Sequence, residues 1–391
     1  MSFDAEHVDE PDRRPLEPRS DRRAEPRPDP GAARPARKAA RGLPAWTVPI
    51  AVIIALLAGE MFARTVGPHL PVIAGTDQES VLKADQLAAR TGQRTDLVFV
   101  GASETAAGLE PTVVDAASHR FDGAYNAALR GASPATDDAW VRRVVLRRLR
   151  PKVVVVGLLP TSLAVLAGAG GQFEAQSDSS YAAAFDRIDP TGVARLEKPA
   201  AKRSALIRYR SSLRQPTALI DGLKSWVTGK AAPVDPNTDP AVIRKAIAPT
   251  GETIEYRAKA LFEGPDPQGS ANLQSVGRAP INLAGLESLF KTVHRQGLQV
   301  VLVLAPIDRR LLRAGGLDFT DLDRTAGQAA ALARRLGVPV LNTFTSDYPS
   351  DLFHDKQHLD AAGSDRWSGE VGTWLDQLCE HGQLGQACAA A

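Results

Sequence analysis

The sequence predicts an α/β protein, a three-layer α/β/α sandwich with a parallel sheet of about five strands, preceded by one transmembrane helix. Between residues 96 and 379, short apolar runs alternate with segments of helical periodicity, which is the pattern of parallel strands joined by crossover helices. One run, K-V-V-V-V at Lys152 to Val156, has the uninterrupted apolar character of a strand covered on both faces. Near the N-terminus, the 18 residues from Gly42 to Gly59 carry no charge. This length is close to the roughly 20 residues that cross a membrane.

Each predicted element has a local signal. Pro111 suits the first turn of a helix, Ser133 is a predicted N-cap, and Gly297 and Gly337 are predicted helix stops. The predicted strands are 97–100, 124–126, 152–156, 299–304 and 338–342, and the predicted helices are 111–117, 134–150, 283–296, 320–336 and 359–379.

The first 65 residues predict a tail and an anchor. Residues 1–42 carry seven prolines and no apolar periodicity, so we expect a disordered cytoplasmic tail. Residues 43–65 are the predicted transmembrane anchor, with Trp46 at one boundary. Because basic residues crowd the segment before the anchor, we expect a single-pass protein of the cell membrane with a cytoplasmic N-terminus and an extracytoplasmic domain. The alternatives are a cleaved signal peptide, which the long leader and the lack of a clear cleavage site disfavour, and a buried helix, which the flanking residues disfavour.

The rest of the chain divides by composition. Residues 66–95 predict a polar tether ending in a helix that Ser80 would cap, and residues 96–379 form the predicted main domain. Gly runs and scattered prolines interrupt the alternation at about 164–280, so we expect an insertion there. Residues 380–391 are a predicted C-terminal tail.

Composition limits the classes of partner. A net charge of +2 with 5% aromatic residues gives no basic excess, so we expect no nucleic-acid partner. The two cysteines do not have the spacing of a zinc site, and we expect no cofactor. Cys379 and Cys388 would form a disulfide in an exported domain and would be thiols in a cytosolic one.

A candidate nucleophile follows the first predicted strand. Residues 96–108 read D-L-V-F-V-G-A-S-E-T-A-A-G, in which a buried strand would end at Gly101 and expose the Ser103 hydroxyl at the carboxyl edge of the sheet. Open α/β sheets bind their ligands at that edge. An ordinary turn or cap serine is the alternative.

A candidate base precedes the last predicted helix. Phe353 to Gly363 reads F-H-D-K-Q-H-L-D-A-A-G, in which Asp355 and His358 would share one face of a helical turn. The carboxylate could then hold imidazole Nδ1 and leave Nε2 free to take a proton from Ser103. A solvated Asp–His pair is the alternative. His354 could join His358 in a metal site, but a third ligand is not evident in the sequence, and we expect no metal.

The order Ser, Asp, His also fits α/β-hydrolases, but Thr105 stands where their nucleophile elbow has its second glycine. Over about residues 96–379, the blocks instead resemble the SGNH (GDSL-like) hydrolase superfamily, in the membrane-anchored branch similar to alginate and peptidoglycan O-acetyltransferases and the teichoic-acid D-alanyl transfer protein. The resemblance implies that Ser103 is the nucleophile, in G-A-S rather than G-D-S, and that a D-x-x-H block supplies Asp355 and His358.

The resemblance also implies an oxyanion hole made by the amides of Ser103 and Gly131, the latter from Y-N-A-A-L-R-G-A-S. The third block departs from the superfamily pattern, G-x-N-D, whose asparagine binds the oxyanion. Here the chain reads G-L-L-P-T-S from Gly157 to Ser162, so that Thr161, Ser162 or another group would have to serve. The loss of one such donor can cost on the order of 100-fold in rate.

A basic stretch within the expected insertion could bind substrate. Tyr209 could stack on a sugar ring, and Arg210 could line a groove for an anionic or sugar substrate. A solvated basic surface is the alternative.

Together these features predict a membrane-anchored extracytoplasmic O-acyltransferase or carbohydrate esterase. It would handle an acyl group, with acetyl expected, on glycans of the cell envelope or an exopolysaccharide through an acyl-serine. For a transferase, the resemblance implies an acyl donor, a glycan acceptor and a membrane-bound O-acyltransferase as partner. The alternative is a catalytically inactive SGNH-like module that binds glycan or scaffolds an envelope complex.

Overall fold

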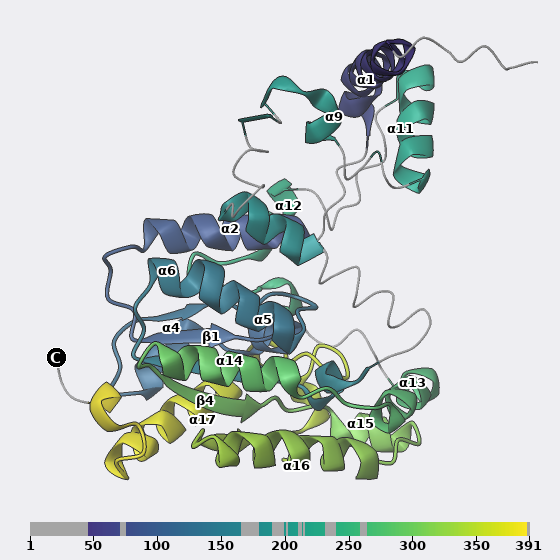
Figure 1. Ribbon diagram of the computed structural model, residues 1–391. Coiled ribbons are helices and arrows are strands. Elements are labelled where there is room, and N and C mark those ends of the chain that lie inside the picture. Colours follow the sequence, from purple (N-terminus) through teal and green to yellow (C-terminus); the bar gives the residue numbers. More distant parts are fainter. Residues whose placement is uncertain are drawn as a thin grey trace, which may run out of the picture. The chain divides into compact units, whose positions relative to one another are not determined.

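The computed structural model describes residues 46–70, 76–165, 180–189, 199–200, 202–209, 213, 216–230, 240–258 and 264–388 (Figure 1). Its centre is a sheet of five parallel strands with helices on both faces. The strands are β1 (Leu97–Val100), β2 (Ala124–Asn126), β3 (Val153–Leu158), β4 (Gln299–Leu304) and β5 (Val340–Asn342). The predicted α/β fold class is confirmed.

The order of the strands is β2-β1-β3-β4-β5. The chain therefore moves from β1 outward to β2 and then returns past β1 to β3. In such doubly wound sheets, the connections diverge to opposite faces at the point where the order reverses. In this sheet the order reverses between β1 and β3, and ligands of such folds bind beyond the carboxyl ends of the strands at that point.

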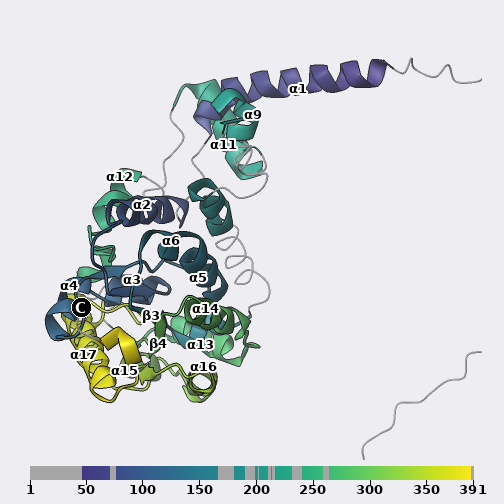
Figure 2. The same ribbon diagram turned by 60° about the vertical axis from the view of Figure 1, so that its left-hand side comes forward.

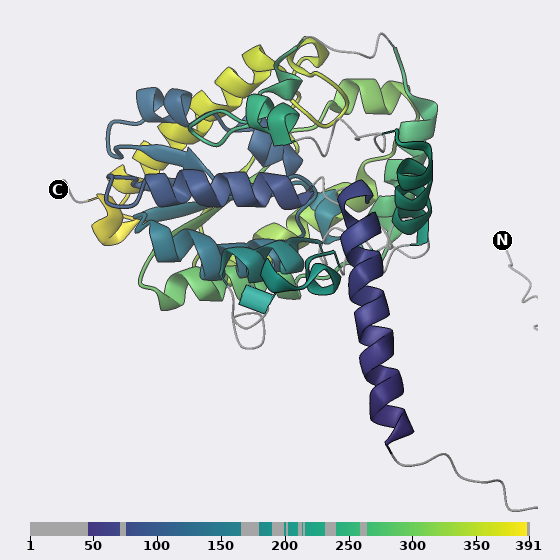
Figure 3. The same cartoon turned by 90° about the horizontal axis from the view of Figure 1, so that it is seen from above.

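Helices cover the two faces of the sheet (Figures 1 and 3). On one side, α17 (Ala361–Glu380) packs on α3 (Ser103–Gly108) and α4 (Pro111–Ala117). On the other side, α14 (Ala284–Arg295) contacts both α5 (Pro134–Trp140) and α16 (Thr320–Arg335). The chain continues from α5 through η2 (Val141–Val145) and α6 (Leu146–Arg148), and the predicted cap is present, since the Ser133 side chain accepts from the Thr136 amide. The remaining elements near the sheet are η3 (Pro160–Leu163), α13 (Pro267–Arg278), α15 (Arg309–Ala314), η6 (Ser350–Leu352) and η7 (Gly385–Cys388).

The expected insertion is not a separate unit, because parts of it complete the core. Tyr181 and Phe185, in a helix at 180–188, are buried, and the Phe185 ring stacks on Trp140 with 5.3 Å between ring centroids. Further described helices of the insertion are α9 (Ala205–Arg208), α11 (Pro216–Thr228), α12 (Pro240–Ala246) and η5 (Glu255–Arg257), and α13 also lies within it.

Two predicted boundaries are shifted. The helix expected at the end of the tether is present as α2 (Thr76–Ala89), which begins before Ser80 and whose Leu87 is fully buried in the core. Ser80 lies inside α2 and does not cap it. The C-terminal tail is likewise packed as far as residue 388, because Leu384 is buried and Cys379 and Cys388 form a disulfide.

Among the described residues, one helix is long and apolar enough to cross a membrane: α1 (Thr47–Val66), which η1 (Gly67–His69) extends. The chain divides within α1 into two units, Met1–Ile54 and Ala55–Ala391. The described part of the first unit is the exposed start of this helix. The prediction of disorder for residues 1–42 lies outside the described residues.

Candidate active site

Ser103 is the first residue of α3 and follows directly from the carboxyl end of β1. Gly101 makes this turn possible, because its φ of +146° is one that other residues rarely adopt. A Cβ on Gly101 would also lie 2.3 Å from the Gly157 carbonyl oxygen of β3. The chain therefore passes tightly between β1 and β3 and leaves the Ser103 side chain half-buried at the carboxyl edge of the sheet.

Thr105 fills the gap between the ends of these two strands. A Cβ on Gly157 would lie 2.1 Å from Thr105 Oγ1, so glycine at position 157 leaves the space that the threonine occupies. The side chain of Asn126 in β2 donates to the carbonyls of Thr105 (2.9 Å) and Leu109 (2.7 Å). The helix that begins with Ser103 is thus fixed by three neighbouring strands.

Asp355 and His358 lie in a turn between η6 and α17, and the prediction of a helical turn is wrong. Asp355 Oδ1 accepts the amides of Gln357 (2.7 Å) and His358 (2.8 Å). An aspartate that binds nearby amides in this way offers the backbone an alternative to helix. The turn is closed by the His354 amide, which donates to the His358 carbonyl at 2.8 Å.

The turn is supported from the loop after β4. Asp308 Oδ1 accepts from the Ser350 hydroxyl at 2.8 Å, and the Asp308 amide donates to the Lys356 carbonyl at 3.1 Å. On the other side, the Ser364 hydroxyl of α17 donates to the Gly108 carbonyl of α3 at 3.1 Å. These contacts hold the segment that follows β5 beside the segment that follows β1.

The structure brings the three predicted residues into one hydrogen-bonded chain. Ser103 Oγ lies 2.9 Å from His358 Nε2, and His358 Nδ1 lies 2.8 Å from Asp355 Oδ2. The side chains of His358 and Asp355 are 13% and 21% exposed, so the chain is shielded but reachable. With Nδ1 donating to the carboxylate, Nε2 is free to accept the serine proton. This is the geometry of a nucleophile with its base and an orienting group.

The carboxylate of Asp355 is held in its ionised form. Burial pushes its pKa upward, but the hydrogen bond and charge of His358 and the amides of Gln357 and His358 outweigh burial and lower the pKa below its ordinary value. The lowered pKa favours the carboxylate form of Asp355, which accepts from His358 Nδ1.

Tyr256, which the sequence analysis did not single out, stacks on the candidate base. Its ring lies parallel to the His358 imidazole, with centroids 4.2 Å apart and 9° between planes. It also meets the His354 ring edge-on at 5.4 Å. Burial and then the charge of Glu255 raise the pKa of Tyr256 to about 12, so its hydroxyl stays neutral. In the sequence, the local sign that this segment is ordered is the turn signal P-T-G at Pro249 to Gly251, shortly before Tyr256.

Backbone contacts fix the segment that carries Tyr256. The Thr253 amide donates to the Ala106 carbonyl of α3 at 2.7 Å, and the Asn126 amide donates to the Thr250 carbonyl at 2.9 Å. Gly251 approaches so closely that a Cβ would lie 2.2 Å from the Asn126 carbonyl oxygen, and its φ is +95°. The insertion thus contributes a wall to the candidate site.

A second carboxyl group, Glu104, is buried beside the candidate nucleophile. Its Oε1 accepts from the Leu159 amide at 3.1 Å. Burial raises its pKa, although its own amide, His358 and the Leu159 amide act in the opposite direction. The raised pKa favours the uncharged form of the Glu104 carboxyl group. A negative charge at this place would destabilise an oxyanion formed at Ser103.

The loop with Gly131 is held beside the end of β1. The Leu129 amide donates to the Gly101 carbonyl at 2.9 Å, and Lys83 Nζ of α2 donates to the Ala128 carbonyl. Gly131 has a φ of +70°, which favours glycine. Its role in the oxyanion hole stays a prediction.

Buried charges on α2 support this loop. The fully buried pair Glu79 and Lys83 lies 3.4 Å apart, and burial lowers the pKa of Lys83 while Glu79 opposes that shift. Arg130 joins Glu79 at 3.1 Å and Glu255 at 2.6 Å. One arginine therefore links α2, the Gly131 loop and the segment carrying Tyr256.

The third block, Gly157 to Ser162, runs from the end of β3 into η3, and its serine bonds to the backbone of the same block. The Ser162 hydroxyl donates to the Leu159 carbonyl at 2.8 Å, while Thr161 is half-buried. The backbone of the block reaches the site instead through the Leu159 amide on Glu104.

Of the two predicted substrate-binding residues, Tyr209 lies away from the hydrogen-bonded chain of Ser103, His358 and Asp355. The Tyr209 ring packs against Gly67 in η1, where it would collide with any Cβ. Arg210 lies outside the described residues. His354, the alternative metal ligand, has its Nδ1 3.0 Å from the Ala258 carbonyl oxygen.

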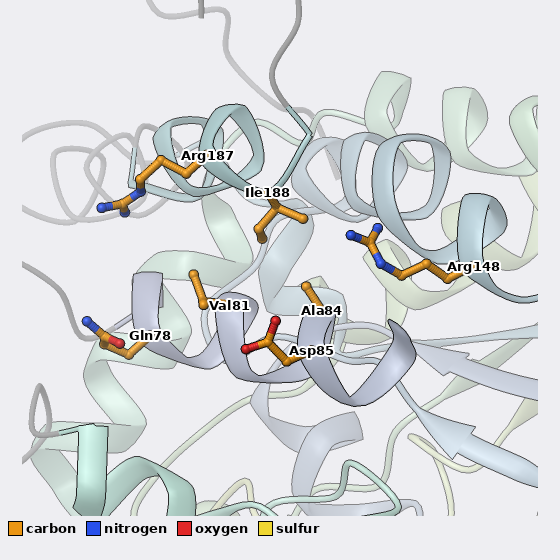
Figure 4. Close-up of a pocket in the computed structure, with 7 residues that line it drawn as sticks. All are labelled: Gln78, Val81, Ala84, Asp85, Arg148, Arg187 and Ile188. Carbon is orange, nitrogen blue, oxygen red and sulfur yellow. The ribbon is translucent and has the colours of Figure 1, made fainter. Parts of the chain in front are cut away.

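A hollow of about 390 Å³ lies between α2, α6 and the helix at 180–188 (Figure 4). Its lining residues are Gln78, Val81, Ala84, Asp85, Arg148, Arg187 and Ile188. None of the predicted site residues lines it.

Comparison of the chain with protein-family models and with curated protein sequences finds no match.

Proposed function

We propose that this chain is a membrane-anchored, extracytoplasmic serine O-acyltransferase or esterase that adds or removes acyl esters, acetyl being the expected group, on glycans of the cell envelope or an exopolysaccharide. The observation that carries the proposal is the chain of hydrogen bonds from Ser103 through His358 to Asp355. The resemblance of the three blocks to SGNH hydrolases supports the acyl-ester chemistry, and the apolar α1 supports the anchor.

In the first half-reaction, His358 Nε2 removes the proton from Ser103 Oγ as Oγ attacks the carbonyl carbon of an acyl ester. The carbonyl electron pair moves to the oxygen, where the amides of Ser103 and Gly131 would stabilise the oxyanion. Collapse of this tetrahedral intermediate breaks the ester bond, and His358 returns the proton to the leaving oxygen. The product is an acyl-serine at position 103.

In the second half-reaction, His358 deprotonates the group that attacks the acyl-serine. Attack by water releases the free acid and makes the protein an esterase. Attack by a sugar hydroxyl forms a new ester and makes it a transferase, and a membrane-bound O-acyltransferase would then supply the acyl donor. Asp355 stabilises the imidazolium in both halves, and the raised pKa of Glu104 favours an uncharged carboxyl group beside the oxyanion.

The proposal is tested with a fluorophosphonate probe on the full-length protein in detergent or nanodiscs. We expect covalent labelling of the wild type and none of Ser103→Ala, with both proteins equally folded by thermal unfolding. An unlabelled but folded wild type would favour the alternative, a glycan-binding or scaffolding module without catalysis.

A second assay separates the two activities. The protein is given a chromogenic acetyl ester with and without a polysaccharide acceptor, and acetate and acetylated glycan are measured separately. Ser103→Ala should abolish both products.

A further inference from the structure

The helix α11 exposes an apolar face. Val227 is 74% exposed, Ile220 52% and Trp226 46%, and Leu223 lies between them on the helical wheel. Soluble surfaces rarely gather such side chains on one helix face without a binding role. Asp221 lies on another, polar side of the helix.

The buried side of α11 is fixed to the end of the apolar helix. Gly222 is packed so closely on Leu70 that a Cβ would lie 2.5 Å from its Cδ2 atom. Leu70 follows η1, which itself continues α1. The helix α11 therefore packs on the short segment that directly follows α1 (Figure 2).

A second contact ties the insertion to α1 further inside its apolar stretch. A Cβ on Gly59 would lie 3.3 Å from Leu206 Cδ1 of α9. The adjacent Glu60 accepts from the Ser204 hydroxyl (2.7 Å) and the Ala205 amide (2.9 Å), so that its carboxylate caps α9. A segment held against Gly59 shares the depth of Gly59 in any bilayer that α1 crosses.

We propose that the exposed apolar face of α11, formed by Ile220, Leu223, Trp226 and Val227, lies in the interface of the lipid bilayer that α1 spans, on the side of the globular domain. The occupant of this face is the boundary between lipid headgroups and acyl chains. The proposal rests on the membrane anchor of the proposed function, and adds a second site of membrane contact within the insertion.

Two features favour lipid as the occupant. The face belongs to a helix whose buried side packs on η1 and Leu70, directly after the apolar α1. Trp226 is the residue type that concentrates at membrane interfaces, and Lys224 at the flank can extend its amine toward headgroup phosphates. An amphipathic helix of this kind lies in the plane of the interface.

Site-directed spin labelling tests the proposal with full-length protein in nanodiscs of phosphatidylcholine and phosphatidylglycerol. The two native cysteines form a disulfide, so a single introduced cysteine provides one labelling site. The labels are placed in Ile220→Cys and Val227→Cys, with Asp221→Cys as the matched polar-side control and Ile54→Cys in α1 as the anchor control. Accessibility to oxygen, which partitions into lipid, is compared with accessibility to a water-soluble nickel chelate.

We expect the oxygen-to-nickel ratio at Ile220 and Val227 to be several-fold above that at Asp221 and to approach that at Ile54. Nickel access at Ile220 and Val227 equal to that at Asp221, with Ile54 in lipid, overturns this inference alone. Protection of Ile220 and Val227 from both reagents means that protein covers the face and also overturns it. Nickel access at Ile54 removes the anchor and the inference together, while labelling of Ser103 by fluorophosphonate would still stand.

Discussion

Replacing Asp355 by asparagine should leave the turn intact and prevent His358 from acting as a base toward Ser103. The Asn carbonyl can still accept the two amides that Asp355 Oδ1 now binds at 2.7 and 2.8 Å. The Asn NH2 group would then face His358 Nδ1, where the carboxylate Oδ2 now accepts at 2.8 Å. Two donors cannot share that bond, so the imidazole must take the other tautomer. Nε2 then carries the proton and donates to Ser103 Oγ instead of accepting from it.

The same change in a serine-protease triad costs about 10,000-fold in kcat, or about 5.4 kcal/mol of transition-state stabilisation. We expect a similar loss for Asp355→Asn in the hydrolysis of a chromogenic acetyl ester and in the rate of fluorophosphonate labelling. Thermal unfolding at neutral pH should change far less, because the amide contacts persist. Activity within tenfold of the wild type would refute the assigned role of the carboxylate.

Three further changes test the surroundings of the triad. Glu104→Gln should remove a pH-dependent loss of stability. Because the pKa of Glu104 in the folded state is raised above 4.5, the folded state keeps a proton that the unfolded state releases. The stability of the wild type therefore falls as pH rises from about 4.5 through the raised pKa. Melting temperatures of the two proteins should therefore diverge over that window in favour of the variant, and parallel curves would contradict the raised pKa of Glu104. Tyr256→Phe should keep the stack on the imidazole and the wild-type rate of ester hydrolysis. Tyr256→Leu should lose the stack and about 0.5–1.5 kcal/mol of transition-state stabilisation, which lowers the rate about 2- to 10-fold. Equal rates in the two variants would argue that the ring does not position His358. Gly157→Ala should lower the free energy of unfolding by about 1–3 kcal/mol in chemical denaturation, because the new methyl group meets Thr105. Gly369→Ala in α17 should not, because its methyl group meets nothing within 4 Å. Equal effects would contradict the close packing of Thr105 against β3.

Most of the sheet could be predicted from the sequence because the strands β1 to β4 are buried almost throughout. The run at 153–158 is fully buried in β3, so its apolar residues stand out from the neighbouring helices, whose exposed faces carry charge. A parallel sheet then places the ends of the first and last strands at one edge, which is why Ser103 and His358 could be expected to meet.

The route by which they meet could not be predicted. In the strand order, β3 and β4 separate β1 from β5, so the turn with Asp355 and His358 must cross the edge of the sheet. That crossing depends on contacts such as Asp308 with Ser350, which no local pattern reveals. Tyr256 was missed for the same reason, because its stack on His358 joins residues about one hundred positions apart in an irregular segment.

The packing of α2 against the core could not be predicted, because the buried side of this helix is charged. Glu79 and Lys83 neutralise each other and bind Arg130 and the Ala128 carbonyl, so a polar sequence packs against the core. Charged residues are almost never fully buried unless they are paired, and the partner here is distant in sequence.

The acyl-serine intermediate is the most direct test of the account. The full-length protein is mixed with an activated acetyl ester, quenched in acid during turnover, digested and mapped by mass spectrometry. The account predicts an acetyl group on the peptide containing Ser103, lost on prolonged incubation with water or a glycan and absent from Ser103→Ala. Turnover without acetyl on Ser103, or with acetyl on another residue, would contradict it.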